Sequence, residues 1–414
     1  MNFESVSRRN FWIHVLEGAV YLSSAVLLSP QTVFPALVAK LGGDNIAVGA
    51  IPIMVYLMFF LPQIFSANYI RSEPFRKPWA LKLGILQRIQ IFFFAIAIAV
   101  FGLRSPSIAL TAFFVIYVAN QVLAGLGSPV WFDLVAKTTT PSDRGKLMGI
   151  RTSFGGLLGF LNGFLLTALL TLLPYPYNFS AVFGVAFLLQ FTSWMILRNV
   201  VETQPSVIES HDSLEHLARR VKEILRRDAI YRRFLVSAAF LIVGLMPTGF
   251  FMIAAIKQYS LEESYVGFFT ITMVTAQILS GALLGWLGDI KGHKASLLLC
   301  SAATAIATVI ALASGSVFYF FPVFFLVGVN LGAEMITRYN FVERCAPDSE
   351  RPLYVGIMNA WLAPFYFSAT LGGWLSDKFG YALVFVIGLV ATLIGILLLN
   401  RLPDPSRPRG IATG

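Results

Sequence analysis

Five ionisable side chains lie within long apolar stretches of this 414-residue chain, where a charge is costly and normally faces a cavity or a partner. Glu17 lies about two turns into the first stretch, and His14 precedes it by one turn on the same helical face. Arg88 lies about nine residues into the third stretch, at a depth of roughly 14 Å by helical rise. Glu334 and Arg338 are four residues apart, so they can pair along one helix. Such groups can exchange protons or hold a charged ligand.

Each of these side chains also has a structural interpretation. Glu334 and Arg338 can neutralise each other, and Arg88 can pair with Glu17, which lies at a similar depth. Arg151, nearer the predicted membrane surface, can extend its polar end to water. We expect Glu17 to carry a coupling proton whose release is driven by a nearby cation, and Glu334 to serve substrate binding or structure.

The elements that must position these side chains are membrane helices. Hydrophobic residues make up 57% of the chain, charged residues make up 13%, and the mean hydropathy is +0.74, which excludes an ordinary soluble globule. Because about 20 apolar residues span a bilayer, the pattern predicts an all-α integral membrane protein with twelve transmembrane helices. These helices cover approximately residues 11–33, 49–69, 79–102, 107–130, 147–173, 178–197, 234–256, 264–287, 295–313, 317–338, 354–376 and 381–399.

A short polar signature occurs twice between apolar stretches, about half a chain apart. The first copy, Pro141–Gly145, contains Arg144, and the second, Pro347–Arg351, ends in Arg351; each arginine is followed by a glycine five residues later. This duplication predicts two pseudo-symmetric six-helix bundles, the usual architecture of a secondary transporter. The expected parts are an N-terminal bundle (1–197), a cytoplasmic amphipathic linker (198–233), a C-terminal bundle (234–400) and a cytoplasmic tail (401–414).

The net charge of +10 is distributed unevenly along this pattern. With both termini in the cytoplasm, most Lys and Arg residues fall in inside loops, and only Lys40, Arg104, Lys257 and Lys378 fall outside. This is the positive-inside rule, so the basic charge indicates topology and no nucleic-acid partner is expected. The expected location is the cytoplasmic (inner) membrane, where the basic face of the linker can contact the lipid bilayer.

The loop after the eighth predicted helix is similar to a known family motif. Gly285–Lys294 reads G-W-L-G-D-I-K-G-H-K and resembles the G-x-L-a-D-r-x-G-r-k loop of the major facilitator superfamily. Leu225–Phe234 resembles that family's entry into its seventh helix, and Gly372–Tyr381 resembles the turn between its last two helices. Together these motifs cover essentially the whole chain. The resemblance implies the twelve-helix fold of that superfamily, but it identifies no subfamily.

The resemblance also implies a gating role for the loop. Asp289 would latch the two bundles in one conformation, because an aspartate can accept hydrogen bonds at a helix N-terminus. The glycines would allow a tight turn and close helix approach. A solvated loop charge is the alternative. The gating-loop candidates are Asp289, Gly285, Lys291, Gly292, Lys294, Arg144 and Arg351.

The first half departs from the family pattern at two positions. Arg71 stands where the loop aspartate is expected, and Gln121 stands where the fourth helix usually carries an arginine. The fifth helix also lacks the Gly-Pro pair typical of drug/proton antiporters. The family's cavity is lined mainly by helices 1, 4, 7 and 10, with contributions from 2, 5, 8 and 11. Uncharged polar candidates for substrate binding on these helices include Asn120, Gln121, Asn330, Gln277 and Asn359; such amides also join membrane helices, at about 0.6 kcal/mol each.

The function that these features predict is secondary active transport of a small molecule by alternating access, with protons as the candidate coupling ion. A transporter-like sensor or assembly scaffold is the first alternative, and a membrane-embedded enzyme is the second. The sequence contains no cluster with metal-ligand spacing, no P-loop and no Gly-x-Ser-x-Gly motif, so we expect no metal, no cofactor and no catalysis. We expect the protein to be a monomer.

Overall fold

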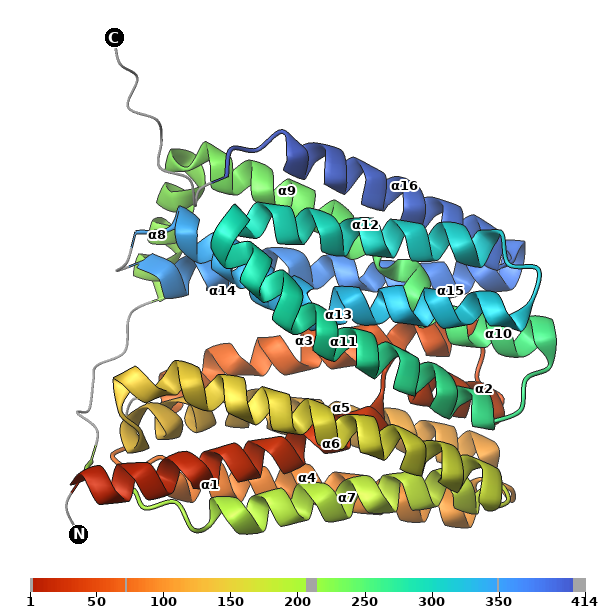
Figure 1. The fold of residues 1–414 in the computed structure, drawn as a ribbon, viewed down its shortest axis with the longest axis horizontal. Coiled ribbons are helices and arrows are strands. Elements are labelled where there is room, and N and C mark those ends of the chain that lie inside the picture. Colours follow the sequence, from red (N-terminus) through yellow and green to blue (C-terminus); the bar gives the residue numbers. More distant parts are fainter. Residues whose placement is uncertain (1–2, 71–72, 206–213, 348–349, 405–414) are drawn as a thin grey trace. The chain divides into compact units, whose positions relative to one another are not determined.

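The computed structural model describes residues 3–70, 73–205, 214–347 and 350–404, and every regular element in these ranges is a helix. The chain forms two compact units (Figure 1). Unit 1 comprises Met1–His211 and Ser260–Val274, and unit 2 comprises Asp212–Tyr259 and Thr275–Gly414. Helix α11 (Ser264–Lys291) therefore begins in unit 1 and ends in unit 2.

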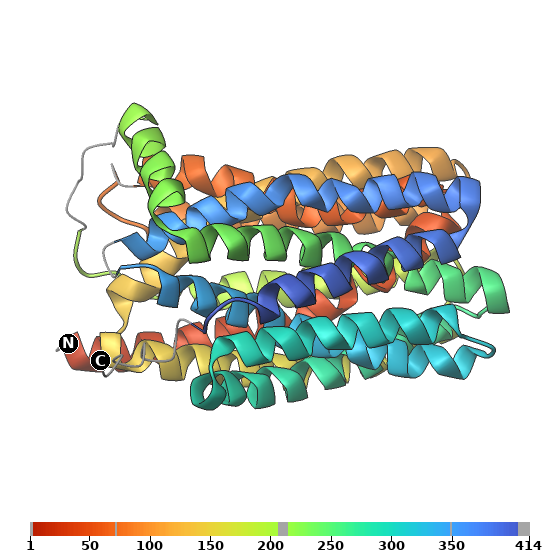
Figure 2. The ribbon, with the colours of Figure 1, turned by 90° about the horizontal axis from the view of Figure 1, so that it is seen from above.

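Unit 1 is built on six long helices that lie side by side (Figures 1 and 2). Helix α1 packs against α6 and α7, α4 packs against α5 and α7, and α3 packs against α5. The elements of unit 1 are α1 (Phe3–Ser24), η1 (Ala25–Leu28), α2 (Val33–Lys40), α3 (Asn45–Ile70), α4 (Lys77–Phe101), α5 (Pro106–Thr138), η2 (Pro141–Asp143), α6 (Arg144–Leu172), α7 (Tyr177–Leu197) and the start of α11.

Unit 2 repeats the helical plan with shorter pieces. Helix α16 packs against α9 and α12, and α12 packs against α13 (Figure 1). Its elements are α8 (Leu214–Arg227), α9 (Ala229–Gly244), η3 (Met246–Gly249), α10 (Phe251–Tyr259), the end of α11, α12 (His293–Leu312), η4 (Val317–Tyr319), α13 (Phe320–Cys345), α14 (Arg351–Leu362), η6 (Ala363–Phe367), α15 (Ser368–Phe379) and α16 (Tyr381–Asn400).

Eleven spans within the described residues are long and apolar enough to cross a membrane, which confirms the prediction of an all-α multi-span protein. The predicted span 354–376 is absent from these eleven because it is divided into α14, η6 and α15. A continuous helix there was a wrong expectation, since Pro364 within η6 has no N–H for the helical ladder. The divided segment still occupies the position of the predicted eleventh span.

The first and seventh predicted spans also end later than expected. A break at η1 is followed by α2, which extends to Lys40, and a break at η3 is followed by α10, which extends to Tyr259. Pro30 follows the first break and Pro247 lies within the second. Both bundles therefore have a discontinuous opening helix, a feature that apolar periodicity does not reveal because hydrophobicity continues through the break.

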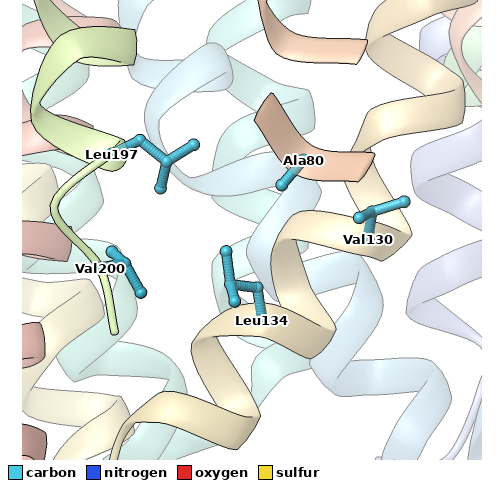
Figure 3. Close-up of a cluster of buried hydrophobic side chains, with 5 residues drawn as sticks. All are labelled: Ala80, Val130, Leu134, Leu197 and Val200. Atoms are coloured by element: carbon cyan, nitrogen blue, oxygen red, sulfur yellow. The ribbon is translucent and has the colours of Figure 1, made fainter. Parts of the chain in front are cut away.

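A buried apolar cluster fixes the end of unit 1 where α7 finishes. Figure 3 shows its five members: Ala80, Val130, Leu134, Leu197 and Val200. They come from α4, α5, α7 and the segment after α7, so the chain beyond Leu197 remains packed on unit 1. Two residues further, Glu202 accepts hydrogen bonds from the backbone N–H groups of Arg76 and Lys77 and pairs with Lys137 at 2.6 Å. The start of α4 is thereby capped by a carboxylate.

Candidate functional site

Glu17 lies on α1 and is only 2% exposed. One carboxylate oxygen, Oε1, accepts a hydrogen bond of 3.2 Å from the Ser193 hydroxyl and lies 3.9 Å from Nη2 of Arg88. The other oxygen, Oε2, is buried without a hydrogen bond. The Trp131 indole N–H is close enough to act on this carboxylate, but its Nε1 also makes no hydrogen bond of ordinary geometry. The carboxylate is therefore buried and only partly satisfied.

Arg88 is held by α4 and α7 more firmly than by Glu17. Its Nε donates to the Gln190 carbonyl at 2.7 Å, and its Nη1 donates to the Gly84 carbonyl at 2.9 Å. Its guanidinium carbon lies 5.2 Å from the Tyr21 ring centroid, within the range of a cation–π contact. The structure thus brings Arg88 and Glu17 together, as the sequence suggested, but the pair is loose because the arginine is fixed by backbone carbonyls.

His14 lies one turn before Glu17 and is fully buried. The Thr138 hydroxyl donates its only hydrogen to the Leu134 carbonyl at 2.6 Å, so it accepts the 2.9 Å hydrogen bond from His14 Nε2. In the neutral imidazole this leaves Nδ1 without a proton, and Nδ1 has no hydrogen-bond partner. His14 therefore places an unused acceptor in the same buried region.

Arg151 on α6 lies in the same buried region, which its sequence position near the predicted membrane surface did not indicate. Its guanidinium carbon lies 4.4 Å from the Trp131 ring centroid, and its charge acts on both Glu17 and His14. Its Nε is buried and makes no hydrogen bond. We expected this side chain to extend to the membrane surface, but it turns inward because Trp131 offers an aromatic face. Trp131 itself was missed, since a single tryptophan in an apolar helix carries no local signal.

These side chains form one buried cluster with an unequal number of opposite charges, and we refer to it as the Glu17 cluster. Two arginines, Arg88 and Arg151, face a single carboxylate, Glu17. Seven buried side-chain atoms in the described part of the chain lack a hydrogen bond, and five of them belong to this cluster and the adjacent α7 turn: His14 Nδ1, Glu17 Oε2, Trp131 Nε1, Arg151 Nε and Gln190 Oε1. Because buried polar groups are normally satisfied, this concentration makes the cluster the candidate ligand site of unit 1.

Unit 2 holds the second predicted pair. Glu334 Oε1 and Arg338 Nε lie 3.1 Å apart along α13, as their i,i+4 spacing predicts. The Tyr366 hydroxyl also hydrogen-bonds Arg338. The glutamate side chain is 16% exposed, so solvent reaches this pair more readily than it reaches Glu17.

The uncharged candidates mostly join helices. Asn120 donates to the Gln87 carbonyl at 2.8 Å, Asn330 donates to the Cys300 carbonyl at 3.3 Å, and Asn359 accepts from Tyr339 at 3.3 Å. Gln121 bonds Tyr117 one turn earlier on α5, and Gln277 is exposed on α11. The contacts of Asn120, Asn330 and Asn359 are hydrogen bonds between helices. In residues 3–70, 73–205, 214–347 and 350–404, no three His, Cys, Asp or Glu side chains gather closely enough to hold a metal ion.

The gating-loop candidates of unit 2 surround a single-residue turn. Gly292 joins α11 to α12 with φ of +95°, a conformation that favours glycine. Asp289, Lys291 and the half-buried Gly285 lie on the last turns of α11, with the two charged side chains exposed. Lys294 donates to the Asn400 and Leu402 carbonyls at 2.7 and 2.6 Å, and so caps the end of α16.

The two arginines of the duplicated signature, Arg144 and Arg351, differ in their structural surroundings. Arg144 donates to the Ala136 carbonyl at 2.6 Å, which closes the turn between α5 and α6. Arg351 is exposed at the first residue of α14. Arg71, the predicted departure in the first half, lies outside the described residues.

A second polar cluster in unit 1 was not predicted. Lys40 Nζ pairs with Glu263 at 2.5 Å and lies 5.1 Å from the Tyr175 ring centroid, while Asn178 hydrogen-bonds the same carboxylate. Burial and the Glu263 carboxylate raise the pKa of the Tyr175 hydroxyl above its ordinary value. The cluster connects the segment before α11 to the last residue of α2 and to the start of α7. Its members are far apart in sequence, so only the fold brings them together.

The fold of the chain is similar to that of solved transporter structures. The fold superposes on the nucleoside transporter NupG with a TM-score of 0.68 and 11% identity, over 97% of this chain and 99% of that chain. It superposes on a D-xylose-proton symporter with a TM-score of 0.70 and 15% identity, over 96% and 98%. A sequence model of the Major Facilitator Superfamily matches residues 249–413. Over these residues, about 40% of its length, the chain is similar to the major facilitator superfamily.

The curated relatives match a smaller part of the chain. Myo-inositol transporter 3C of Cryptococcus neoformans var. grubii is 29% identical over 150 residues, which is 36% of this chain and 25% of that protein. Myo-inositol transporter 3A of the same organism is 28% identical over 151 residues. The chain thus aligns with only about a quarter of the length of these relatives. The residues matched by the superfamily model, 249–413, do not include the Glu17 cluster.

Proposed function

We propose that this protein is a secondary active transporter that moves a small molecule across a membrane by alternating access. The fold supports this function, because the similar solved structures are transporters aligned over nearly their whole length. A discontinuous opening helix in each bundle is also typical of transporter binding sites.

The observation that carries the substrate proposal is the excess positive charge of the Glu17 cluster. Arg88 and Arg151 are largely buried with only Glu17 as a nearby carboxylate. An uncompensated charge inside a membrane protein is costly. A ligand that carries a carboxylate or another anionic group could take the place of Glu17 beside the two arginines and accept a hydrogen bond from the unused Arg151 Nε–H. We therefore propose a small anionic or zwitterionic substrate.

The same charge count suggests how a proton could be coupled. Without ligand, the Glu17 carboxylate is the partner of both arginines. When a ligand anion takes that place, two neighbouring anions would repel each other, and Glu17 can relieve this by binding a proton. The net charge of the cluster is then the same in both states. This gives symport of one proton with one anionic group.

The membrane arrangement completes the proposal. We propose that the protein lies in the cytoplasmic membrane as a monomer with both termini inside, organised as bundles 1–197 and 234–400, a linker at 198–233 and a tail at 401–414. The uneven distribution of Lys and Arg supports this orientation. External cysteine labelling at position 104 but not at position 291 is the expected result, and the reverse pattern would overturn the orientation.

We also propose that Asp289 acts as a latch between conformations. Its exposed carboxylate at the end of α11 is free to approach a helix N-terminus. Asp289→Asn should shift the population by about 1 kcal/mol, the scale of a helix-dipole contact. Cysteine accessibility within the internal cavity measures this shift, and an unchanged profile would end the latch proposal.

Thermal unfolding of purified protein in the presence of candidate ligands tests the substrate class. Small carboxylates, amino acids and phosphate esters form the anionic and zwitterionic set, and myo-inositol and D-xylose form the neutral set. A ligand at 100 times its Kd stabilises the folded state by about 2.7 kcal/mol. Stabilisation by the anionic set alone is expected. Stabilisation by neutral polyols alone would overturn the substrate class.

Transport itself is tested separately in reconstituted vesicles. Uptake of the stabilising ligand should exceed that of protein-free vesicles and should rise with an inward proton gradient. Binding without any uptake would favour a sensor over a transporter.

A further inference from the structure

An apolar groove lies on one face of unit 2, between α9, the α14–η6 segment and α16. Its volume is about 470 Å³, within the roughly 300–1,000 Å³ range of small-molecule sites. Its lining side chains are all apolar and include Val236, Phe240, Trp361, Phe365, Val390 and Ile394. The lining crosses the helix break at Ala363–Phe367, which divides the predicted eleventh span.

The groove is directed at the membrane rather than at a polar substrate path. Val236, Trp361 and Val390 are 43%, 44% and 49% exposed although they lie on membrane helices. The one polar group in the lining, the Trp361 indole N–H, is already donated to the Leu235 carbonyl at 3.2 Å. With no free donor or acceptor, the groove suits a hydrocarbon chain and not a hydrophilic molecule.

Two arginines flank one end of this groove. Arg233 lies three and seven residues before Val236 and Phe240, so all three share one face of α9. Arg401 lies seven and eleven residues after Ile394 and Val390, so these share one face of α16.

The two arginines are at the same level along the groove. Helices α9 and α16 lie side by side (Figure 1), and the Ser237 hydroxyl donates to the Gly395 carbonyl at 2.9 Å. This contact sets an antiparallel register in which the start of α9 meets the end of α16.

Neither guanidinium is used elsewhere in the part of the chain that the structure describes. Arg233 and Arg401 are both exposed and make no side-chain hydrogen bond or ion pair there. Their neighbours differ: Arg232 donates to the Leu225 and Arg226 carbonyls, and Lys294 caps α16. Two free cations at the end of a hydrocarbon groove match the layout of an anionic phospholipid, with a charged headgroup above an acyl chain.

We propose that this groove binds an anionic phospholipid, whose acyl chain occupies the space between Phe240, Trp361 and Val390 and whose headgroup phosphate is held by Arg233 and Arg401. The site is independent of the Glu17 cluster. A phospholipid bound here would bridge α9, α14 and α16, including the break at η6. It would therefore stabilise the divided span of unit 2.

Quenching of Trp361 by brominated lipids tests the site. The protein is reconstituted in nanodiscs of phosphatidylcholine that contain an equal mole fraction of brominated phosphatidylglycerol or brominated phosphatidylcholine. The difference between wild type and Trp361→Phe isolates the signal of this tryptophan. Stronger quenching by phosphatidylglycerol is expected, and the preference should fall about fivefold for each of Arg233→Gln and Arg401→Gln.

Two further variants make the test specific. Arg8→Gln removes an exposed arginine of unit 1 and should leave the preference unchanged. Val390→Phe fills the groove and should reduce quenching by brominated phosphatidylglycerol towards the phosphatidylcholine level. Equal quenching of wild type by both lipids, or a preference that survives the double substitution of Arg233 and Arg401, would overturn the proposal.

Discussion

Each unit of this protein buries one glutamate beside an arginine, but the two pairs differ in how completely they are satisfied. Glu334 and Arg338 lie on one helix, 3.1 Å apart, with Tyr366 as a further partner. Glu17 is 3.9 Å from an arginine on another helix and leaves one oxygen without a hydrogen bond. The first pair neutralises itself locally. The second is held between α1, α4 and α7 and remains open to a further partner.

This difference indicates which of the two ion pairs can accept a ligand. A ligand would have to displace a close contact of 3.1 Å to enter the Glu334–Arg338 pair. The 3.9 Å contact between Glu17 and Arg88 is weaker, so a ligand anion displaces it at a smaller cost. We therefore assign coupling and substrate binding to the Glu17 cluster and a mainly structural role to Glu334 and Arg338.

The largest expected effect is that of Glu17→Gln on transport. Removing the carboxylate should abolish uptake driven by a pH gradient, because the proton site is lost, while ligand exchange across the membrane continues. Vesicle uptake and exchange assays measure the two activities. Glu343→Gln, which alters an exposed carboxylate of α13, is the matched control and should retain both. Normal gradient-driven uptake by Glu17→Gln would show that Glu17 does not couple protons, and the proposed difference between Glu17 and Glu334 would be lost.

The next effect is on stability. Arg88→Gln should lower the free energy of unfolding by about 3 to 5 kcal/mol, because it removes the cation nearest to the buried Glu17 carboxylate and leaves only the neutral Ser193 hydroxyl at its Oε1. Denaturant unfolding in detergent measures this loss, with Arg104→Gln at an exposed loop position as control. Adding Glu17→Gln to the variant should restore part of the stability. If the double variant were no more stable than Arg88→Gln, the two side chains would not be coupled.

The corresponding change in unit 2 should be smaller. Arg338→Gln should lower the free energy of unfolding by about 1 to 2 kcal/mol, because Glu334 is partly exposed and the solvent screens its charge. Glu334→Gln should leave proton-driven uptake in place. A loss equal to that of Arg88→Gln, or an uncoupled Glu334→Gln protein, would reverse the roles assigned to the two units.

The smallest effect concerns the glycine loop whose full motif occurs only in unit 2. Gly292→Ala should cost about 1 to 2 kcal/mol, because its φ of +95° is strained for any residue with a Cβ. Gly285→Ala is the matched control: its Cβ would meet no atom within 4 Å, and the backbone there is helical. That substitution should be neutral or slightly stabilising in thermal unfolding. Equal losses at both positions would show that the turn does not require glycine.

The features that the sequence predicted correctly depend on residues that are close together in the chain. Apolar length identified the membrane spans, and i,i+4 spacing identified the Glu334–Arg338 pair. The breaks at η1, η3 and η6 were not predicted as breaks, since hydrophobicity continues through them and a membrane helix tolerates proline. Their positions depend on how neighbouring helices satisfy the freed backbone groups.

Prediction of the Glu17 cluster was incomplete for a different reason. Glu17, His14 and Arg88 stood out because charge is rare in apolar stretches. Arg151 did not, because its position near the predicted surface allowed it to reach water, and only the Trp131 ring shows why it turns inward. The long-range contacts of Glu202 and Glu263 had no local signal at all.

Proton uptake on ligand binding tests the proposed coupling role of Glu17 most directly. Isothermal titration calorimetry in buffers of different ionisation enthalpy counts the protons that accompany binding of the most stabilising carboxylate. The charge balance of Glu17, Arg88 and Arg151 predicts about one proton taken up per ligand by wild type, and none by Glu17→Gln. Binding to wild type without proton uptake, or the same uptake by Glu17→Gln, would contradict the account.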